Sequence, residues 1–289
     1  MKCKLCSQNR VLRKSHIIPK FIIRWLKDTS ATGYLRQAVR PNLRKQDLPT
    51  QVLLCDECET RFSRWETQFS QSIFIPYWDG ETEFLYDDWL LKFAVSLIWR
   101  AGIVQLEDFR RYKPNLVHHL EHALSVWKEY LLDRALSPKP YAHHLLFMDF
   151  VESVEGITLP KGFHWYTMRA VDTTILASSK EVYGYVKLPA MVFFTGIFPN
   201  RPSGWKNTLL RTRGKISTSN QMVSHNTFGE FYLDRVQRSE RLATTISPRQ
   251  QEKISVTIKR DPERSVQSHS FQIFLAEQHW NISKKQANN

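Results

Sequence analysis

Cys3-Lys4-Leu5-Cys6 and Cys55-Asp56-Glu57-Cys58 contain every cysteine of this 289-residue chain. Two C-x-x-C pairs with no cysteine left over predict one tetrahedral zinc site with Cys3, Cys6, Cys55 and Cys58 as ligands. Four thiolates fill the coordination shell, so this zinc is expected to be structural. A redox role is the alternative, but the surrounding sequence does not predict the βαβ context of thioredoxin-like motifs.

The long interval between the two cysteine pairs is where functional residues are expected. It opens with Ser15-His16-Ile17-Ile18-Pro19, and it ends with the apolar run Val52-Leu53-Leu54, which predicts a strand entering the second pair. Glu59 follows the second pair directly, and apolar residues at helical spacing predict a helix from there. The sequence therefore predicts a strand, a cysteine pair and a helix in succession.

These motifs resemble the four-cysteine branch of the HNH (ββα-metal) endonucleases over roughly residues 1–70. That family's pattern has a C-x-x-C pair, a metal-binding Asp or His before a catalytic His-Ile-x-Pro, and an Asn ahead of a second C-x-x-C followed by His. The resemblance implies a treble-clef or ββα-metal fold. It also implies that His16 takes a proton from the attacking water and that Glu59 binds Mg²⁺ or another divalent catalytic cation.

Three positions depart from the family pattern. Ser15 stands where a metal-binding Asp or His is usual, Thr50 where the Asn is usual, and Glu59 where the final His is usual. A carboxylate is a preferred Mg²⁺ ligand, whereas a hydroxyl is a weak one. Ser15 and Thr50 are therefore auxiliary candidates, as is Glu66, two helical turns beyond Glu59. The alternatives are a packed histidine at position 16 and a helix-terminal carboxylate at position 59.

The charge of the chain favours an anionic partner. The formal net charge is +13, with basic residues concentrated in residues 1–75 and 201–289 and a mildly acidic stretch between them. Phosphate backbones are natural ligands of such segments, which predicts DNA binding. The DNA-binding candidates near the N-terminus are Arg13, Lys14, Lys20, Arg36, Arg40, Arg44 and Lys45. Arg211, Arg213 and Lys215 are secondary candidates.

The resemblance implies an HNH-like unit over residues 1–78. Hydrophobic periodicity predicts a helical region over 79–140 and a mixed β-rich region over 141–289, so the whole chain is expected to be an α+β protein. A helix is expected over Phe228–Leu242, and a disordered polar tail after Trp280. Strands are expected at residues 145–147, 165–168, 174–176, 182–186, 192–194 and 254–258. The charged start and the lack of a long apolar run predict a cytoplasmic protein without a membrane span.

Three functions compete on these observations. The leading hypothesis is a metal-dependent HNH-like endonuclease that hydrolyses DNA phosphodiester bonds, for which the resemblance implies a bacterial or phage-related defence setting. The second is a zinc-dependent nucleic-acid-binding protein with a degenerate HNH site. The third is an assembly module whose zinc site only scaffolds contact with a partner. Separately, residues 80–289 are the region in which a protein partner is expected to bind.

Overall fold

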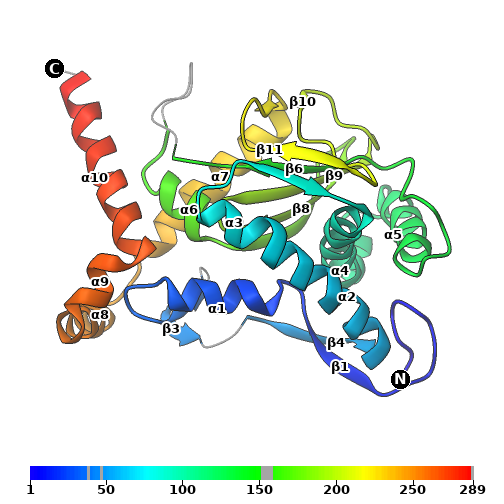
Figure 1. The fold of residues 1–289 in the computed structure, drawn as a ribbon, viewed down its shortest axis with the longest axis horizontal. Helices are drawn as coiled ribbons and strands as arrows, with labels where there is room; N and C mark the ends of the chain where they lie inside the picture. The colour runs from blue at the N-terminus through cyan, green and yellow to red at the C-terminus, as the bar shows by residue number, and fades with distance from the viewer. Residues whose placement is uncertain (38–39, 46–47, 151–158, 288–289) are drawn as a thin grey trace. The chain divides into compact units, whose positions relative to one another are not determined.

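The computed structural model describes residues 1–37, 40–45, 48–150 and 159–287 (Figure 1). The chain forms two compact units, and each is assembled from separate stretches of sequence. The first unit comprises residues 1–21, 49–147 and 171–225, and the second comprises residues 22–48, 148–170 and 226–289. The α+β class expected from the sequence is confirmed.

The compact units do not follow the consecutive regions expected from the sequence. β5 (Glu83–Tyr86) pairs antiparallel with β11 (Gly214–Ser217), although the two strands lie far apart in the chain. This pairing joins the expected helical region to the expected C-terminal region within one unit. Hydrophobic periodicity finds elements but not their long-range partners, so the three expected regions stay a prediction beside the two compact units.

The first unit begins with two strands and a helix. β1 (Leu12–His16) pairs antiparallel with β4 (Thr50–Cys55), in a register that sets Leu12 opposite Cys55 and His16 opposite Thr50. α2 (Asp56–Phe69) starts where β4 ends, as Figure 1 shows, and continues into η1 (Ser70–Phe74) and α3 (Ile75–Trp78). The residues that α2 buries recur at helical spacing and are Cys58, Phe62, Trp65 and Phe69.

A four-stranded antiparallel sheet and a long helix form the core of the first unit. The sheet order is β6 (His143–Phe147), β9 (Met191–Phe198), β8 (Val182–Leu188) and β7 (Asp172–Ala177). α4 (Asp88–Tyr112) packs on this sheet, on α2 and on α5 (Val117–Leu131). Every residue of β8 is buried, so its side chains are covered on both faces of the sheet. Two short strands, β10 (Trp205–Lys206) and β12 (Met222–Val223), also pair.

Within the described part of the chain, α4 is the one helix that is long and apolar enough to cross a membrane. Its most apolar window is 67% buried inside the structure, as expected for a core helix.

The second unit combines a short hairpin with helices. The hairpin consists of β2 (Leu35–Gln37) and β3 (Arg40–Lys45). The helices are α1 (Lys20–Asp28, which begins in the first unit), α6 (Phe163–Arg169), α7 (Asn226–Ala243), α8 (Pro248–Arg260), α9 (Pro262–Gln267) and α10 (His269–Ala287). Polar contacts join them: Arg169 donates to the Leu26 carbonyl at 2.6 Å, and Glu277 accepts from the buried His164 backbone N–H at 2.9 Å.

Several expected elements are confirmed and others are wrong. The strands expected in the sheet region are β6, β7, β8 and β9, and the helix expected at Phe228–Leu242 is α7. The strands expected at 165–168 and 254–258 are instead helical, in α6 and α8, and α10 continues to Ala287 where a disordered tail was expected. Aromatic and β-branched residues favour strands only weakly, and tertiary packing overrides that preference. In α8, Pro248 at the first turn favours a helix.

Close packing between β8 and α4 leads to a stability prediction. A Cβ added at Gly184 would lie 2.4 Å from Ile98 Cγ2 on α4. Gly184→Ala is therefore expected to destabilise the protein by about 1–3 kcal/mol, the usual cost of overpacking. Gly229→Ala in α7 is the matched control, because nothing lies within 4 Å of its added Cβ. Urea unfolding checks both, and equal midpoints for wild type and Gly184→Ala would contradict this packing.

Candidate functional site

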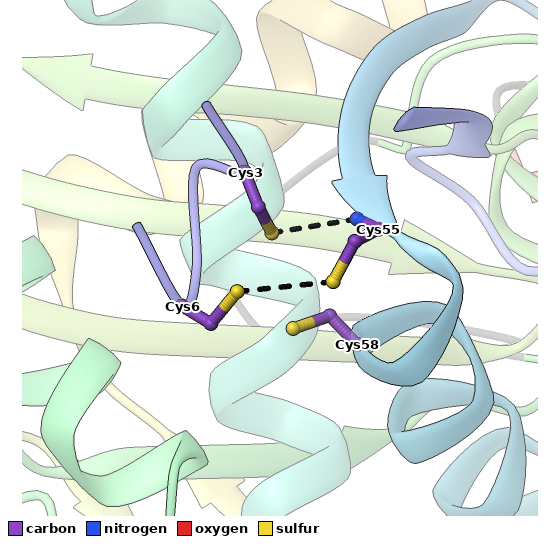
Figure 2. Close-up of side chains that lie close together, drawn as sticks. All are labelled: Cys3, Cys6, Cys55 and Cys58. Atoms are coloured by element: carbon purple, nitrogen blue, oxygen red, sulfur yellow. Dashed lines mark hydrogen bonds between the residues drawn. The ribbon is translucent and has the colours of Figure 1, made fainter. Parts of the chain in front are cut away.

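The four cysteines come together at the start of α2. Cys3 and Cys6 lie in the N-terminal loop, Cys55 is the last residue of β4, and Cys58 is in the first turn of α2 (Figure 2). Their Sγ atoms all lie within 4.8 Å of one another. The clustering predicted from the two C-x-x-C pairs is thus confirmed.

Backbone hydrogen bonds hold the N-terminal loop in place. Cys3 N–H donates to the Gln8 carbonyl at 2.9 Å, and Ser7 N–H donates to the Cys3 carbonyl at 3.0 Å. Lys4 N–H donates to the Leu53 carbonyl of β4 at 3.0 Å, while Cys55 N–H donates to Cys3 Sγ at 3.4 Å. The loop is therefore attached to β4 by its backbone as well as by the sulfur cluster.

The protonation of the cysteines is consistent with a cation site. Burial and the neighbouring sulfurs raise the pKa of the Cys58 thiol. Burial acts in the same direction on Cys3, but backbone N–H groups, that of Cys55 foremost, outweigh it and lower the pKa of Cys3. Crowded sulfurs resist holding several negative charges unless a cation balances them. Four sulfurs at this spacing fit a tetrahedral metal ion such as zinc.

A second group of polar residues lies beside the cysteines, where β1 meets α2. Ser15 Oγ donates a hydrogen bond to the carboxylate of Glu59 in the first turn of α2. Ser15 is 1% exposed, and Glu59 is half-buried. His16, also half-buried, follows Ser15 and lies opposite Thr50 in the strand register. The structure therefore brings Ser15 and Glu59 into contact, with His16 and Thr50 paired at the same end of the two strands.

Arg100 of α4 links this group to Glu66. Its Nη1 donates both to the His16 backbone carbonyl and to Glu66 Oε1, each at 2.8 Å. The side chains of Arg100 and Glu66 are 3% and 19% exposed. Burial raises the pKa of Glu66, Arg100 opposes that effect, and the charges of Glu59 and His16 act on Glu66 in opposite directions. His16, Glu59, Glu66 and Arg100 therefore belong to one electrostatic cluster.

The surface beside Glu59 is open. Glu59 lines an open depression whose lining residues all belong to α2, the others being Thr60, Ser63, Arg64, Thr67 and Gln68. Glu59 thus contacts Ser15 and also lines this depression.

The DNA-binding candidates fall in both compact units. Arg13 and Lys14 lie in β1 and Lys20 at the start of α1, and Arg13 is paired with Asp56 at 3.0 Å. Arg36, Arg40 and Arg44 lie in the β2–β3 hairpin, and Lys45 ends β3 but its side chain lies outside the described residues. The secondary candidates Arg213 and Lys215 pair with Asp87 and Glu83.

Comparisons with protein-family models, curated proteins and solved structures found no match to this chain. The resemblance to the HNH endonucleases therefore rests on its motifs. The structure itself establishes an α+β protein with a four-cysteine cluster near its N-terminus that is able to hold a metal ion.

Sequence reasoning did not find Arg100. It is 84 residues from His16, in a helix whose apolar period indicates only a core element. The one available signal was a lone arginine, next to Trp99, within a mostly apolar segment. A buried charge in such a run requires a partner, but the sequence alone does not identify Glu66 as that partner.

The purified chain is expected to carry one zinc ion at the cysteine cluster. Metal binding at such sites is coupled to folding and contributes on the order of 10 kcal/mol, so Cys55→Ala is expected to unfold the β1–β4–α2 region. Elemental analysis and thermal melting measure both effects, with Thr60→Ala on the exposed side of α2 as the control. Zinc release should increase as the pH falls, because protons compete for the sulfurs. A zinc-free protein, or unchanged melting of Cys55→Ala, would contradict the assignment.

The Arg100–Glu66 pair gives a second prediction for this region. Arg100→Met leaves the Glu66 carboxylate without its cationic partner, and breaking a buried pair in this way costs roughly 3–5 kcal/mol. Arg100→Met with Glu66→Gln is expected to regain much of that stability. Arg110→Met, which removes an exposed cation of the same helix, is the matched control and should change little. Additive losses for Arg100→Met and Glu66→Gln in urea unfolding would show that the two side chains are not coupled.

Proposed function

We propose that this chain is a metal-dependent HNH-like endonuclease that hydrolyses phosphodiester bonds of DNA. The observation that carries the proposal is the hydrogen bond from Ser15 to Glu59, two residues 44 positions apart. They occupy the two positions at which the HNH pattern places its metal ligands. Their contact lies between a strand and a helix, next to His16 and beside four clustered cysteines.

In this proposal, His16 is the general base. It accepts a proton from a water molecule as the water oxygen attacks the scissile phosphorus, and the bond from phosphorus to the 3′ oxygen breaks. A divalent cation such as Mg²⁺, when bound, stabilises the negative charge on the leaving 3′ oxygen. Glu59 would hold this cation with a carboxylate oxygen, and solvent would supply the proton to the leaving group.

The other polar residues of the cluster would orient His16 and Glu59. Ser15 directs the Glu59 carboxylate, and Arg100 holds the backbone of His16 through its carbonyl. Thr50, opposite His16, would contribute at the edge of the site, and Glu66 would balance the charge of Arg100. The structural zinc at Cys3, Cys6, Cys55 and Cys58 would keep β1, β4 and α2 together.

The runner-up is a zinc-dependent nucleic-acid-binding or assembly protein with a degenerate HNH site. One observation favours it: the Ser15 hydroxyl, a weak metal ligand, is hydrogen-bonded to Glu59 in the position of a strong one. In the leading proposal and in the nucleic-acid-binding form of the runner-up, the basic residues bind the phosphate backbone, whereas the assembly form requires no such contact. The cytoplasmic setting is part of the leading proposal and rests on the composition of the sequence, whereas a role in bacterial or phage-related defence rests on the resemblance alone.

Substitutions at His16 and Glu59 test the nuclease directly. His16→Ala is expected to slow cleavage of plasmid DNA by about 10²- to 10⁴-fold, the usual effect of losing a general base, while zinc content and DNA binding persist. Glu59→Ala is expected to abolish cleavage through loss of the cation, with partial recovery at raised Mn²⁺. The assay compares Mg²⁺, Mn²⁺ and Ni²⁺.

His118→Ala serves as the control, since His118 is an exposed histidine on α5 of the same unit. It should cleave as the wild type does. A wild type that cleaves with none of the three cations, or a His16→Ala protein that cleaves at the wild-type rate, would exclude the nuclease proposal and favour the binding alternative.

A further inference from the structure

Two arginines lie side by side in the hairpin of the second unit. Arg36 of β2 and Arg44 of β3 are directly opposite each other in the antiparallel register, and both are half-buried. Side chains at opposite positions share one face of a hairpin and are close neighbours, so two like charges there destabilise it. Burial, together with the charge of Arg44, lowers the pKa of Arg36.

Among the described residues, the groups that contact these two guanidiniums are neutral. The side chain of Gln250 in α8 is 7% exposed, and its amide orientation follows from the hydrogen bonds it completes. In that orientation its oxygen accepts from Arg36 Nη1 at 3.2 Å, Arg36 Nη2 at 3.0 Å and Arg44 Nε at 3.3 Å. Arg36 Nη1 also donates to the Pro41 carbonyl at 3.0 Å, and the Arg44 guanidinium lies 4.5 Å from the centre of the Tyr34 ring.

No carboxylate balances this pair among the described residues. Neither arginine forms an ion pair with a described aspartate or glutamate, and the first turn of α8 contains no acidic residue. The bond to Gln250 uses one of the five N–H donors of Arg44, so most of its capacity to bind an anion is still available.

Hydrogen bonds attach the β2–β3 hairpin, which carries the two arginines, to the helices of the second unit. Asn42 in β3 donates from Nδ2 to the Thr245 carbonyl at 3.2 Å and accepts from Ser247 N–H at 2.7 Å. These bonds attach the hairpin to the turn between α7 and α8, and Gln250 attaches it again one helical turn further on. Little ordering would therefore be required when an anion binds.

We infer that Arg36 and Arg44 together bind one phosphate group and that its source is the backbone of a nucleic acid. Guanidinium groups match the oxygens of a phosphate in pairs of hydrogen bonds, and the negative charge would offset the repulsion between the arginines. The choice of nucleic acid over free phosphate rests on the proposed function. The phosphate site itself rests on the arginine pair and Gln250.

The test measures binding separately from cleavage. Fluorescence anisotropy of a labelled DNA duplex is recorded on the His16→Ala protein without added divalent cation, over a series of salt concentrations. The variant is Arg36→Gln with Arg44→Gln. The matched control is Lys259→Gln with Arg260→Gln, which removes the same charge from exposed residues at the far end of α8. Thermal melting with inorganic phosphate, at matched ionic strength, provides the second arm.

If Arg36 and Arg44 bind one phosphate between them, the affinity for DNA, its salt dependence and the melting temperature should change as follows. The Arg36/Arg44 variant should bind DNA at least tenfold more weakly than the control variant. The slope of log affinity against log salt should fall by about 0.9, the value for one phosphate contact, whereas two separate contacts would reduce it by about 1.8. Its melting temperature should not fall, because a repulsive pair has been removed.

Two results would overturn the inference. If the Arg36/Arg44 and Lys259/Arg260 variants lose equal affinity for DNA, then Arg36 and Arg44 contribute only to the overall positive charge and form no specific phosphate site. Unchanged DNA affinity, with inorganic phosphate stabilising the wild type but not the Arg36/Arg44 variant, would assign the site to free phosphate instead. A wild type that fails to cleave DNA but shows the predicted binding loss would exclude the nuclease proposal alone.

Discussion

The four cysteine sulfurs, all within 4.8 Å of one another, are the constraint on which the rest of the N-terminal architecture depends. They join the loop before β1 to the junction of β4 and α2, which the β1–β4 strand pair, backbone hydrogen bonds and ion pairs such as Arg13–Asp56 also connect. Burial and mutual repulsion make four bare thiolates unfavourable together, so a cation is the natural means of stabilising this junction. The positions of Ser15, His16 and Glu59 follow from it.

The cluster of His16, Glu59, Glu66 and Arg100 is supported by the core of the first unit. β1 ends at His16, and a buried arginine from α4 binds the His16 carbonyl. α4 is itself packed against the four-stranded sheet, so the core of the first unit fixes the end of β1. In the proposed nuclease, support of this kind would hold His16 in a fixed position. A binding site for DNA alone would need it less, because phosphate contacts tolerate small displacements.

The sequence predicted what depends on local pattern and failed where distant contacts decide. Cysteine spacing identified the metal cluster, and alternating or continuous apolar runs identified β8, β9 and α7. The same reasoning assigned strands to residues 165–168 and 254–258, where packing and a helix-starting proline favour helices. It named Ser15 and Glu59 without predicting their hydrogen bond. It missed Arg100, because the partner of a buried charge is set by the fold and not by spacing along the chain.

A metal at the four cysteines is expected to hold β1, β4 and α2 together. The direct measurement is hydrogen exchange of the purified protein, first with zinc bound and then after a strong chelator has removed the zinc. Amides of residues 12–16 and 50–69 should lose their protection from exchange when the metal is removed, while those of β8 and β9 should keep theirs. Unchanged protection of β1 and α2 after complete loss of zinc would contradict this expectation.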